Sequence, residues 1–280
     1  MLGVLAGICV SLIAVGTIGN ISWNAKVASL ADKLPAEPRY DRNPTVNTYL
    51  SNDATGPVEK YFSSVLVDGE PPIAKAVIHH SGSFNMGQDD EQWHVFKSVQ
   101  HVMLDPPGFV WNAKIRMVPG VPARVIDAYI DGDAVLTGKL LGLITVMELP
   151  NSPELAEGEL MRFVAEAAWY PTALLRPNVS WEPIDLHTAR VTLTDKSTTV
   201  SLEVRFSDDN LISSIYSEGR FRDVDGVQVK TPWEGRFWNY EERGGMMIPL
   251  DGEVAWILPS GRKPYWRGHM DVIEYIRTDA

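Results

Sequence analysis

Most of the chain alternates apolar and polar positions with the period of two that is typical of β-strands. Segments rich in β-branched and aromatic residues are separated by short breaks such as Asp131-Gly132, Asp195-Lys196-Ser197 and Asp225-Gly226. Breaks of this kind are typical of β-hairpin turns. The pattern therefore predicts strands at residues 73–80, 92–104, 109–118, 124–130, 134–149, 189–194, 198–206, 211–217, 219–224, 235–240, 246–249, 253–258 and 265–276.

One segment between the two groups of strands has helical periodicity instead. Ser152 followed by Pro153 is a typical helix start, and the helix is expected to end at Tyr170, before a proline. Apolar residues at helical spacing form one stripe, namely Leu160, Phe163, Val164 and Ala167. The short connections between strands predict an antiparallel meander that curls into a barrel or half-barrel. We therefore expect a mainly β, α+β fold in which this helix plugs the concave face of a curved antiparallel sheet.

The N-terminal segment, residues 2–21, carries no charged side chain. Twenty helical residues rise about 30 Å, which is enough to cross the hydrocarbon core of a membrane. We expect an uncleaved transmembrane helix that contacts the lipid bilayer, while a cleaved signal peptide and a buried soluble helix stay as alternatives. Basic residues after this segment favour a cytoplasmic flank, although acidic residues are interspersed among them.

The domain organisation follows from these patterns and from the proline distribution. Four prolines, little apolar periodicity and many polar residues mark residues 23–57 as a tether, apart from a short helix that could form near residues 25–34. The expected organisation is a transmembrane anchor at 1–22, the tether at 23–57 and a β-rich domain at 58–280, subdivided into a first sheet half at 58–150, a helix at 151–176 and a meander at 177–280.

Charge and motifs exclude several classes of function. The chain has 36 acidic and 25 basic residues, a net charge of −11, which argues against nucleic acid as a partner. Cys9, the only cysteine, lies in the N-terminal segment, so the rest of the chain has no disulfide and no thiol nucleophile. No histidine pair has helical zinc-site spacing, and phosphate-binding and dinucleotide-binding glycine motifs are absent. We expect neither a metal nor a cofactor.

Three charged residues of the predicted helix are the best catalytic candidates. Glu159, Arg162 and Glu166 fall on one helical stripe that lies close to Trp169. Two carboxylates bridged by a guanidinium could hold a polar head group, and a desolvated Glu166 could serve as a general base with Arg162 as its electrostatic partner. The alternative is a solvated helix face stabilised by ordinary ion pairs.

Tryptophan is unusually frequent, with nine residues in 280. Its side chain fills β-sheet cores and also suits apolar ligand cavities. We expect Trp111, Trp169, Trp233 and Trp256 to line a concave ligand site. The first functional hypothesis is a membrane-anchored module that binds a lipid, an acyl chain or another apolar ligand. The alternatives are a structural or interaction subunit of a membrane complex and, third, a hydrolase-like enzyme that uses Glu166.

Several motifs resemble those of a widespread bacterial family of uncharacterised proteins. They are ELMRFVAEAAWYPT at 159–172, GFVWNA at 108–113, WEPID at 181–185, PWEG at 232–235 and EVAW at 253–256, and the resemblance runs from about residue 94 to residue 275. The resemblance implies no reaction, because the function of that family is unassigned.

The expected architecture, a curved sheet plugged by a helix, looks like that of the periplasmic lipoprotein carriers LolA and LolB. Those carriers hold acyl chains in an apolar cavity, and likeness of fold alone does not establish function. This resemblance implies that the soluble domain lies outside the cytoplasm, at a bacterial cell membrane.

Overall fold

The computed structural model describes residues 2–35, 56–67, 69–87 and 90–277, with side chains from Gly16 onward. Within these residues, three α-helices, two 3₁₀ turns and thirteen strands are present. The helices and turns are α1 (Leu2–Ala31), α3 (Pro57–Val65), α4 (Pro153–Glu166), η1 (Ala167–Trp169) and η2 (Pro171–Leu175). The strands are β1 (Ile73–Asn85), β2 (Trp93–Met103), β3 (Gly108–Val118), β4 (Val121–Ile130), β5 (Asp133–Leu140), β6 (Ile144–Leu149), β7 (Val179–Pro183), β8 (Thr188–Asp195), β9 (Thr198–Phe206), β10 (Ile212–Val224), β11 (Val227–Arg243), β12 (Met246–Leu258) and β13 (Gly261–Arg277).

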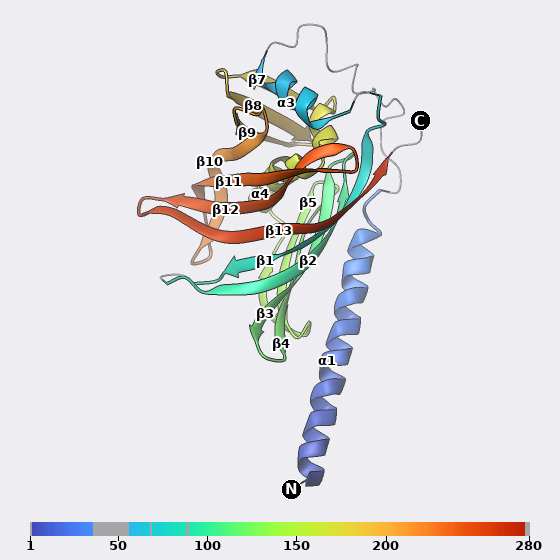
Figure 1. The fold of residues 1–280 in the computed structure, drawn as a ribbon. Coiled ribbons are helices and arrows are strands. Elements are labelled where there is room, and N and C mark those ends of the chain that lie inside the picture. The colour runs from blue at the N-terminus through green and yellow to red at the C-terminus, as the bar shows by residue number, and fades with distance from the viewer. Residues whose placement is uncertain (1, 36–55, 68, 88–89, 278–280) are drawn as a thin grey trace.

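All thirteen strands of the described residues form one antiparallel sheet in the order β6-β5-β4-β3-β2-β1-β13-β12-β11-β10-β9-β8-β7. Two meanders are joined where β1 pairs with β13. The segment that contains α4 connects the two edge strands, β6 and β7. The sheet bends around α4 (Figure 1). We call the face toward α4 the inner face and the opposite one the outer face. The predicted curved, mainly β half-barrel with a plugging helix is confirmed.

Three predicted strand boundaries are wrong, and strand β7 was not predicted. The strands predicted at 246–249 and 253–258 are one continuous strand, β12. Glycine explains the other two boundaries. The strand predicted at 134–149 is divided into β5 and β6, because Leu141 and Gly142 both adopt positive φ angles, 54° and 74°, in a tight turn. Conversely, the strands predicted at 211–217 and 219–224 are one continuous strand, β10. Its register shifts between Ser217 and Arg220, so the intervening glycine belongs to a bulge rather than to a turn.

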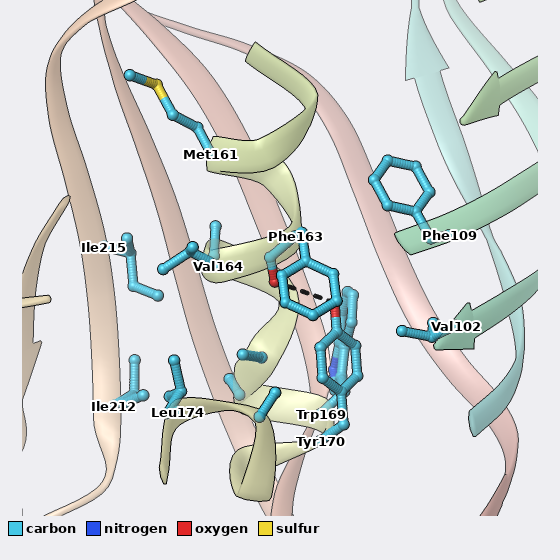
Figure 2. Packing of buried hydrophobic residues seen from close by; sticks show 14 of the residues in the cluster. Val102, Phe109, Met161, Phe163, Val164, Trp169, Tyr170, Leu174, Ile212 and Ile215 are labelled. Atoms are coloured by element: carbon cyan, nitrogen blue, oxygen red, sulfur yellow. Dashed lines mark hydrogen bonds between the residues drawn. The ribbon is translucent and has the colours of Figure 1, made fainter. Parts of the chain in front are cut away.

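Helix α4 packs its apolar stripe into the half-barrel, as predicted. Figure 2 shows Val164 on the side toward Ile215, whereas Phe163 and Tyr170 lie on the side of Phe109. The Tyr170 hydroxyl donates a hydrogen bond to the Phe163 carbonyl at 3.0 Å, which fixes the end of the helix against the turns that follow. A single buried cluster includes the stripe of α4 and inner-face residues of both halves of the sheet.

The start of α4 is stabilised by a serine N-cap, which a substitution can test. Ser152 Oγ accepts a hydrogen bond from the Leu155 backbone N–H at 3.2 Å, and Pro153 follows at the first helical position. Ser152→Ala is expected to lower the free energy of unfolding by about 1 kcal/mol, and Ser152→Gly by only a few tenths. Urea unfolding followed by tryptophan fluorescence measures both, and equal losses in the two variants would contradict a capping role.

Helix α1 packs through its second half on the outer face of β3 and β4. Trp23 is buried there, and its Nε1 donates a hydrogen bond to Asn112 Oδ1 at 2.8 Å. Val110 and Ile126 lie in the same small cluster. The helix therefore extends into the region predicted as a tether, of which residues 36–55 lie outside the described residues.

A transmembrane helix was expected within residues 1–22. Among the helices in the described part of the chain, none combines the length and the apolar character that crossing a membrane requires. Contact of residues 2–21 with a bilayer stays a prediction.

Candidate functional site

The charged stripe of α4 is buried between the helix and the inner face of the sheet. Arg162 Nε contacts Glu166 Oε1 at 2.7 Å, and Arg162 Nη1 contacts Asp127 Oδ2 of β4 at 2.6 Å. Gln100 of β2 completes the arrangement, because its Nε2 donates to Glu166 Oε2 at 2.6 Å. Arg162, Asp127 and Glu166 side chains are only 14–16% exposed. The helix is thereby tied to two strands of the first half of the sheet.

Two aromatic rings complete the surroundings of the Arg162 guanidinium. Its central carbon lies 4.8 Å from the centroid of the Phe109 ring and 5.1 Å from that of Trp111. Such contacts stabilise a cation that has lost part of its hydration. Burial opposes ionisation, but the carboxylates of Glu166 and Asp127 outweigh it and raise the pKa of Arg162, so the side chain is a permanent buried cation.

Glu159 ties the same helix to the other half of the sheet. The residue is 3% exposed, and its Oε1 lies 3.4 Å from Nη2 of Arg220 on β10. Arg220 also donates from Nη1 to the Tyr265 hydroxyl at 3.2 Å and from Nε to the Gly158 carbonyl at 3.2 Å. The polar network therefore bridges both meanders through one helix.

The network contains three carboxyl groups and two guanidinium groups. Glu159 Oε2 and Asp127 Oδ1 are buried without a donor from any described residue. Burial, followed by the negative charge of Asp127, raises the pKa of Glu159 to about 8. At neutral pH, a protonated Glu159 would donate a hydrogen bond to Asp127, leaving two cations, Arg162 and Arg220, balanced by two anions, Asp127 and Glu166.

An aromatic cluster lies where the turns after α4 meet the sheet. The rings of His80 and Trp169 are 4.6 Å apart, and those of His80 and Trp266 are 5.9 Å apart. Trp266 also lies 5.9 Å from Phe96, and Trp169 lies 5.8 Å from Phe237. The cluster thus joins the helical segment to strands β1, β2, β11 and β13.

His80 is unusual within this cluster. It is 2% exposed, and neither ring nitrogen has a hydrogen-bond partner among the described residues. Burial, followed by the positive charge of Arg162, lowers the pKa of His80 to about 3. The imidazole is therefore neutral at physiological pH and packs in the cluster as an aromatic ring.

The four tryptophans predicted to line a ligand site all lie around α4. Trp111 and Trp169 are 4% and 3% exposed and lie near Arg162 and the aromatic cluster, respectively. Trp233 donates from Nε1 to the Tyr265 hydroxyl at 2.9 Å, and Trp256 stacks on the same tyrosine at a centroid distance of 5.6 Å. The structure brings them to one face in two groups, and their role as ligand contacts stays a prediction.

The proposed general base is engaged on both oxygens. Glu166 accepts hydrogen bonds from Arg162 on one oxygen and from Gln100 on the other, an arrangement that orients the carboxylate. This geometry favours a structural role for Glu166, and its catalytic role stays an untested prediction. Within the described residues, no group of three or more His, Cys, Asp or Glu side chains is arranged to hold a metal ion.

A shallow hollow of about 460 Å³ opens on the outer face of β1, β11, β12 and β13. Its polar walls are already paired: His269 Nδ1 lies 2.7 Å from Asp251 Oδ1, and Arg267 Nε lies 2.6 Å from Glu253 Oε2. Trp238, 48% exposed, forms its apolar side. The hollow lies away from α4 and from the residues singled out in the sequence.

Sequence reasoning missed the sheet partners of the charged stripe. Gln100, Asp127 and Arg220 belong to three strands that are distant in sequence, and period-two alternation alone could have placed each on the inner face. Which of them meets Arg162 depends on strand order and register, and one sequence does not contain a local signal for either.

Comparison with known proteins agrees with the expected resemblance. The model of a family described as "Family of unknown function (DUF6920)" matches residues 55–275. No curated protein matches the chain. Among solved structures, a LolA superfamily protein from Nitrosomonas europaea is 12% identical, with a TM-score of 0.41, over 84% of this chain and 96% of that one. A β-barrel-like protein of the domain of unknown function DUF1849 from Brucella abortus is 9% identical, with a TM-score of 0.24, over 74% of this chain and 100% of that one.

Proposed function

The chain belongs to this family of unknown function, and from the geometry of the inner face we propose that it binds a lipid, an acyl chain or a similar apolar ligand inside the half-barrel. The observation that carries the proposal is the aromatic cluster around Trp169. An apolar ligand gains free energy in proportion to the area it buries, and large aromatic rings offer such area on a curved surface. The imidazole of His80, which is neutral at physiological pH, adds no charge to this surface.

In this proposal, α4 and the turns after it occupy the place that the ligand takes. Because this segment connects the two edge strands, β6 and β7, it can move without breaking any strand pairing. The pairing of Arg162 with Asp127 and of Glu159 with Arg220 opposes that movement. Ligand binding would therefore displace apolar contacts of the helix first and would retain the polar network as its anchor.

The test uses the full chain, purified without detergent. Mass spectrometry of its organic extract is expected to show a near-stoichiometric lipid, and a brominated fatty acid is expected to quench tryptophan emission. In the Trp169→Phe variant, the fatty acid should quench much less of the emission than in the unmodified chain. In the Trp238→Phe variant, which removes an exposed tryptophan of the outer face, the quenching should be retained. An extract without lipid together with no quenching would overturn the proposal and favour a structural or interaction subunit of a membrane complex.

We also propose that the chain is held at a bacterial cell membrane through residues 2–21, with the β domain outside the cytoplasm. Two observations support the contact with a membrane: residues 2–21 are uncharged, and Ile18 and Ile21 of α1 are 60% and 65% exposed. Fractionation of cells and protease treatment of spheroplasts test it. Recovery of the full chain in the soluble fraction would contradict this location.

A further inference from the structure

A row of basic side chains crosses the outer face of the first half of the sheet. Lys97 of β2 is the cross-strand partner of Lys114 on β3. Lys114 is paired in turn with Arg124 on β4, and Arg124 with Lys139 on β5. Arg116 lies two residues beyond Lys114 and therefore on the same face. Like charges directly opposite one another destabilise a sheet, so four in succession are an unfavourable arrangement for the isolated chain.

The row has no acidic partner within the described part of the chain. Lys97, Lys114, Arg116 and Lys139 form no salt bridge there, whereas the arginines of the second half of the sheet, such as Arg262, are paired with carboxylates. Arg124 donates a hydrogen bond to the neutral side chain of Asn20 on α1. In a chain with a net charge of −11, this positive row is a local exception.

An exposed apolar rim lies beside the row, toward the β3–β4 and β5–β6 turns. Its members are 38–65% exposed and comprise Val95, Val118, Leu143, Ile144 and Val146 of the sheet together with Ile18 and Ile21 of α1. The helix and the β5–β6 turn approach closely at Gly19, where an added Cβ would lie 2.1 Å from the Leu141 carbonyl oxygen. From this level, the first half of α1 continues beyond the sheet (Figure 1).

An apolar rim bordered by basic residues matches the depth profile of an anionic membrane surface, in which the acyl boundary lies beneath a layer of phosphates. We propose that the turn end of strands β2–β6 docks on anionic lipid headgroups, with the rim at the acyl boundary and the basic row at the phosphates. Nucleic acid fits this surface less well, because it offers nothing to the exposed isoleucines and valines. The inference rests on the proposed membrane location and is independent of a ligand on the inner face.

The test is flotation of the full chain with vesicles of phosphatidylcholine alone or with about 30 mol% phosphatidylglycerol. We expect at least about tenfold stronger partitioning onto the anionic vesicles at low salt, and loss of most of this preference near 0.5 M salt. The triple variant Lys97→Gln, Lys114→Gln, Lys139→Gln should lose the preference for anionic vesicles. Its binding to both kinds of vesicle should be as weak as the binding of the unmodified chain to the neutral ones. These side chains are on the sheet surface, so the fold should be retained.

The control variant Lys60→Gln, Lys230→Gln, Arg243→Gln removes the same charge from exposed positions outside strands β2–β6, and it should keep the anionic preference. Equal binding to both vesicles, an unchanged preference in the first variant, or no vesicle binding at all would overturn the docking surface. Stronger binding to an RNA duplex than to the anionic vesicles would do so as well. Equal binding to both vesicles would overturn the docking surface but leave the proposed membrane location intact. Failure of the docking surface is therefore distinguishable from failure of the membrane location.

Discussion

Replacing Arg162 with methionine is expected to lower the free energy of unfolding by about 3–5 kcal/mol. Methionine retains most of the side-chain volume, so the loss comes from charge and not from a cavity. Without the guanidinium, Asp127 and Glu166 remain mostly buried and lose their direct ion-pair partner. Chemical unfolding of the full chain at neutral pH, followed by tryptophan fluorescence, measures the loss.

The chain offers a matched control for this prediction. Arg190 also bridges two carboxylates, Glu182 at 3.3 Å and Glu203 at 3.1 Å, but its side chain is 43% exposed. Water solvates these charges when the arginine is removed, so Arg190→Met should cost less than about 1 kcal/mol. Similar losses in the two variants would show that burial of the Arg162 network does not determine its contribution.

Local patterns in the sequence were sufficient for most of the secondary structure. Alternation with period two located the strands, and Ser152-Pro153 located the start of α4, because each signal acts within a few residues. The apolar stripe also predicted which face of α4 would be buried. The burial of the adjacent, charged stripe was not predictable in the same way. A stripe of Glu and Arg is typical of a solvated face unless partners arrive from elsewhere in the fold.

Those partners arrive through strand order. The network needs Asp127 of β4 and Arg220 of β10 on opposite sides of one helix, which requires a sheet wide enough to curl around it. The same dependence applies to the basic row, whose paired members are 10–17 residues apart in sequence and become neighbours only in one register. Cross-strand sites are therefore harder to predict from sequence than helical ones, in which spacing alone defines the neighbours.

The helix consequently connects the two meanders through both polar and apolar contacts. Trp169 Nε1 donates to the Pro249 carbonyl of β12 at 3.0 Å, and the Tyr275 hydroxyl of β13 donates to the Trp169 carbonyl at 2.6 Å. These bonds fix the turns after α4 to the second half of the sheet, while Arg162 fixes the helix itself to the first half. A ligand that separates helix and sheet must therefore break both the hydrogen bonds of Trp169 and the polar network of Arg162. The charge state of Glu159 influences the polar network.

Alkaline pH is expected to destabilise the fold through Glu159. Its pKa is raised from the ordinary value to about 8, so the folded state retains a proton that the unfolded chain releases near pH 4.5. The contribution to stability is fully present below pH 4.5, declines as the pH rises through 8 and is constant above that. Between pH 5 and pH 9 the free energy of unfolding should fall by on the order of 3–5 kcal/mol.

Glu159→Gln isolates this contribution, because glutamine cannot ionise yet keeps a donor for Asp127 and an acceptor for Arg220. The difference in unfolding free energy between this variant and the unmodified chain should grow in favour of the variant from pH 5 to pH 9. His80 and His101, whose pKa values are lowered chiefly by burial, add a slope of opposite sign below about pH 6.5, and it cancels in the difference. Glu157→Gln, on the same helix and paired with Lys230, is the control and should show no such growth. A pH-independent difference for Glu159→Gln would mean that Glu159 is ionised in the folded state, and that the two guanidinium groups together stabilise three buried carboxylates.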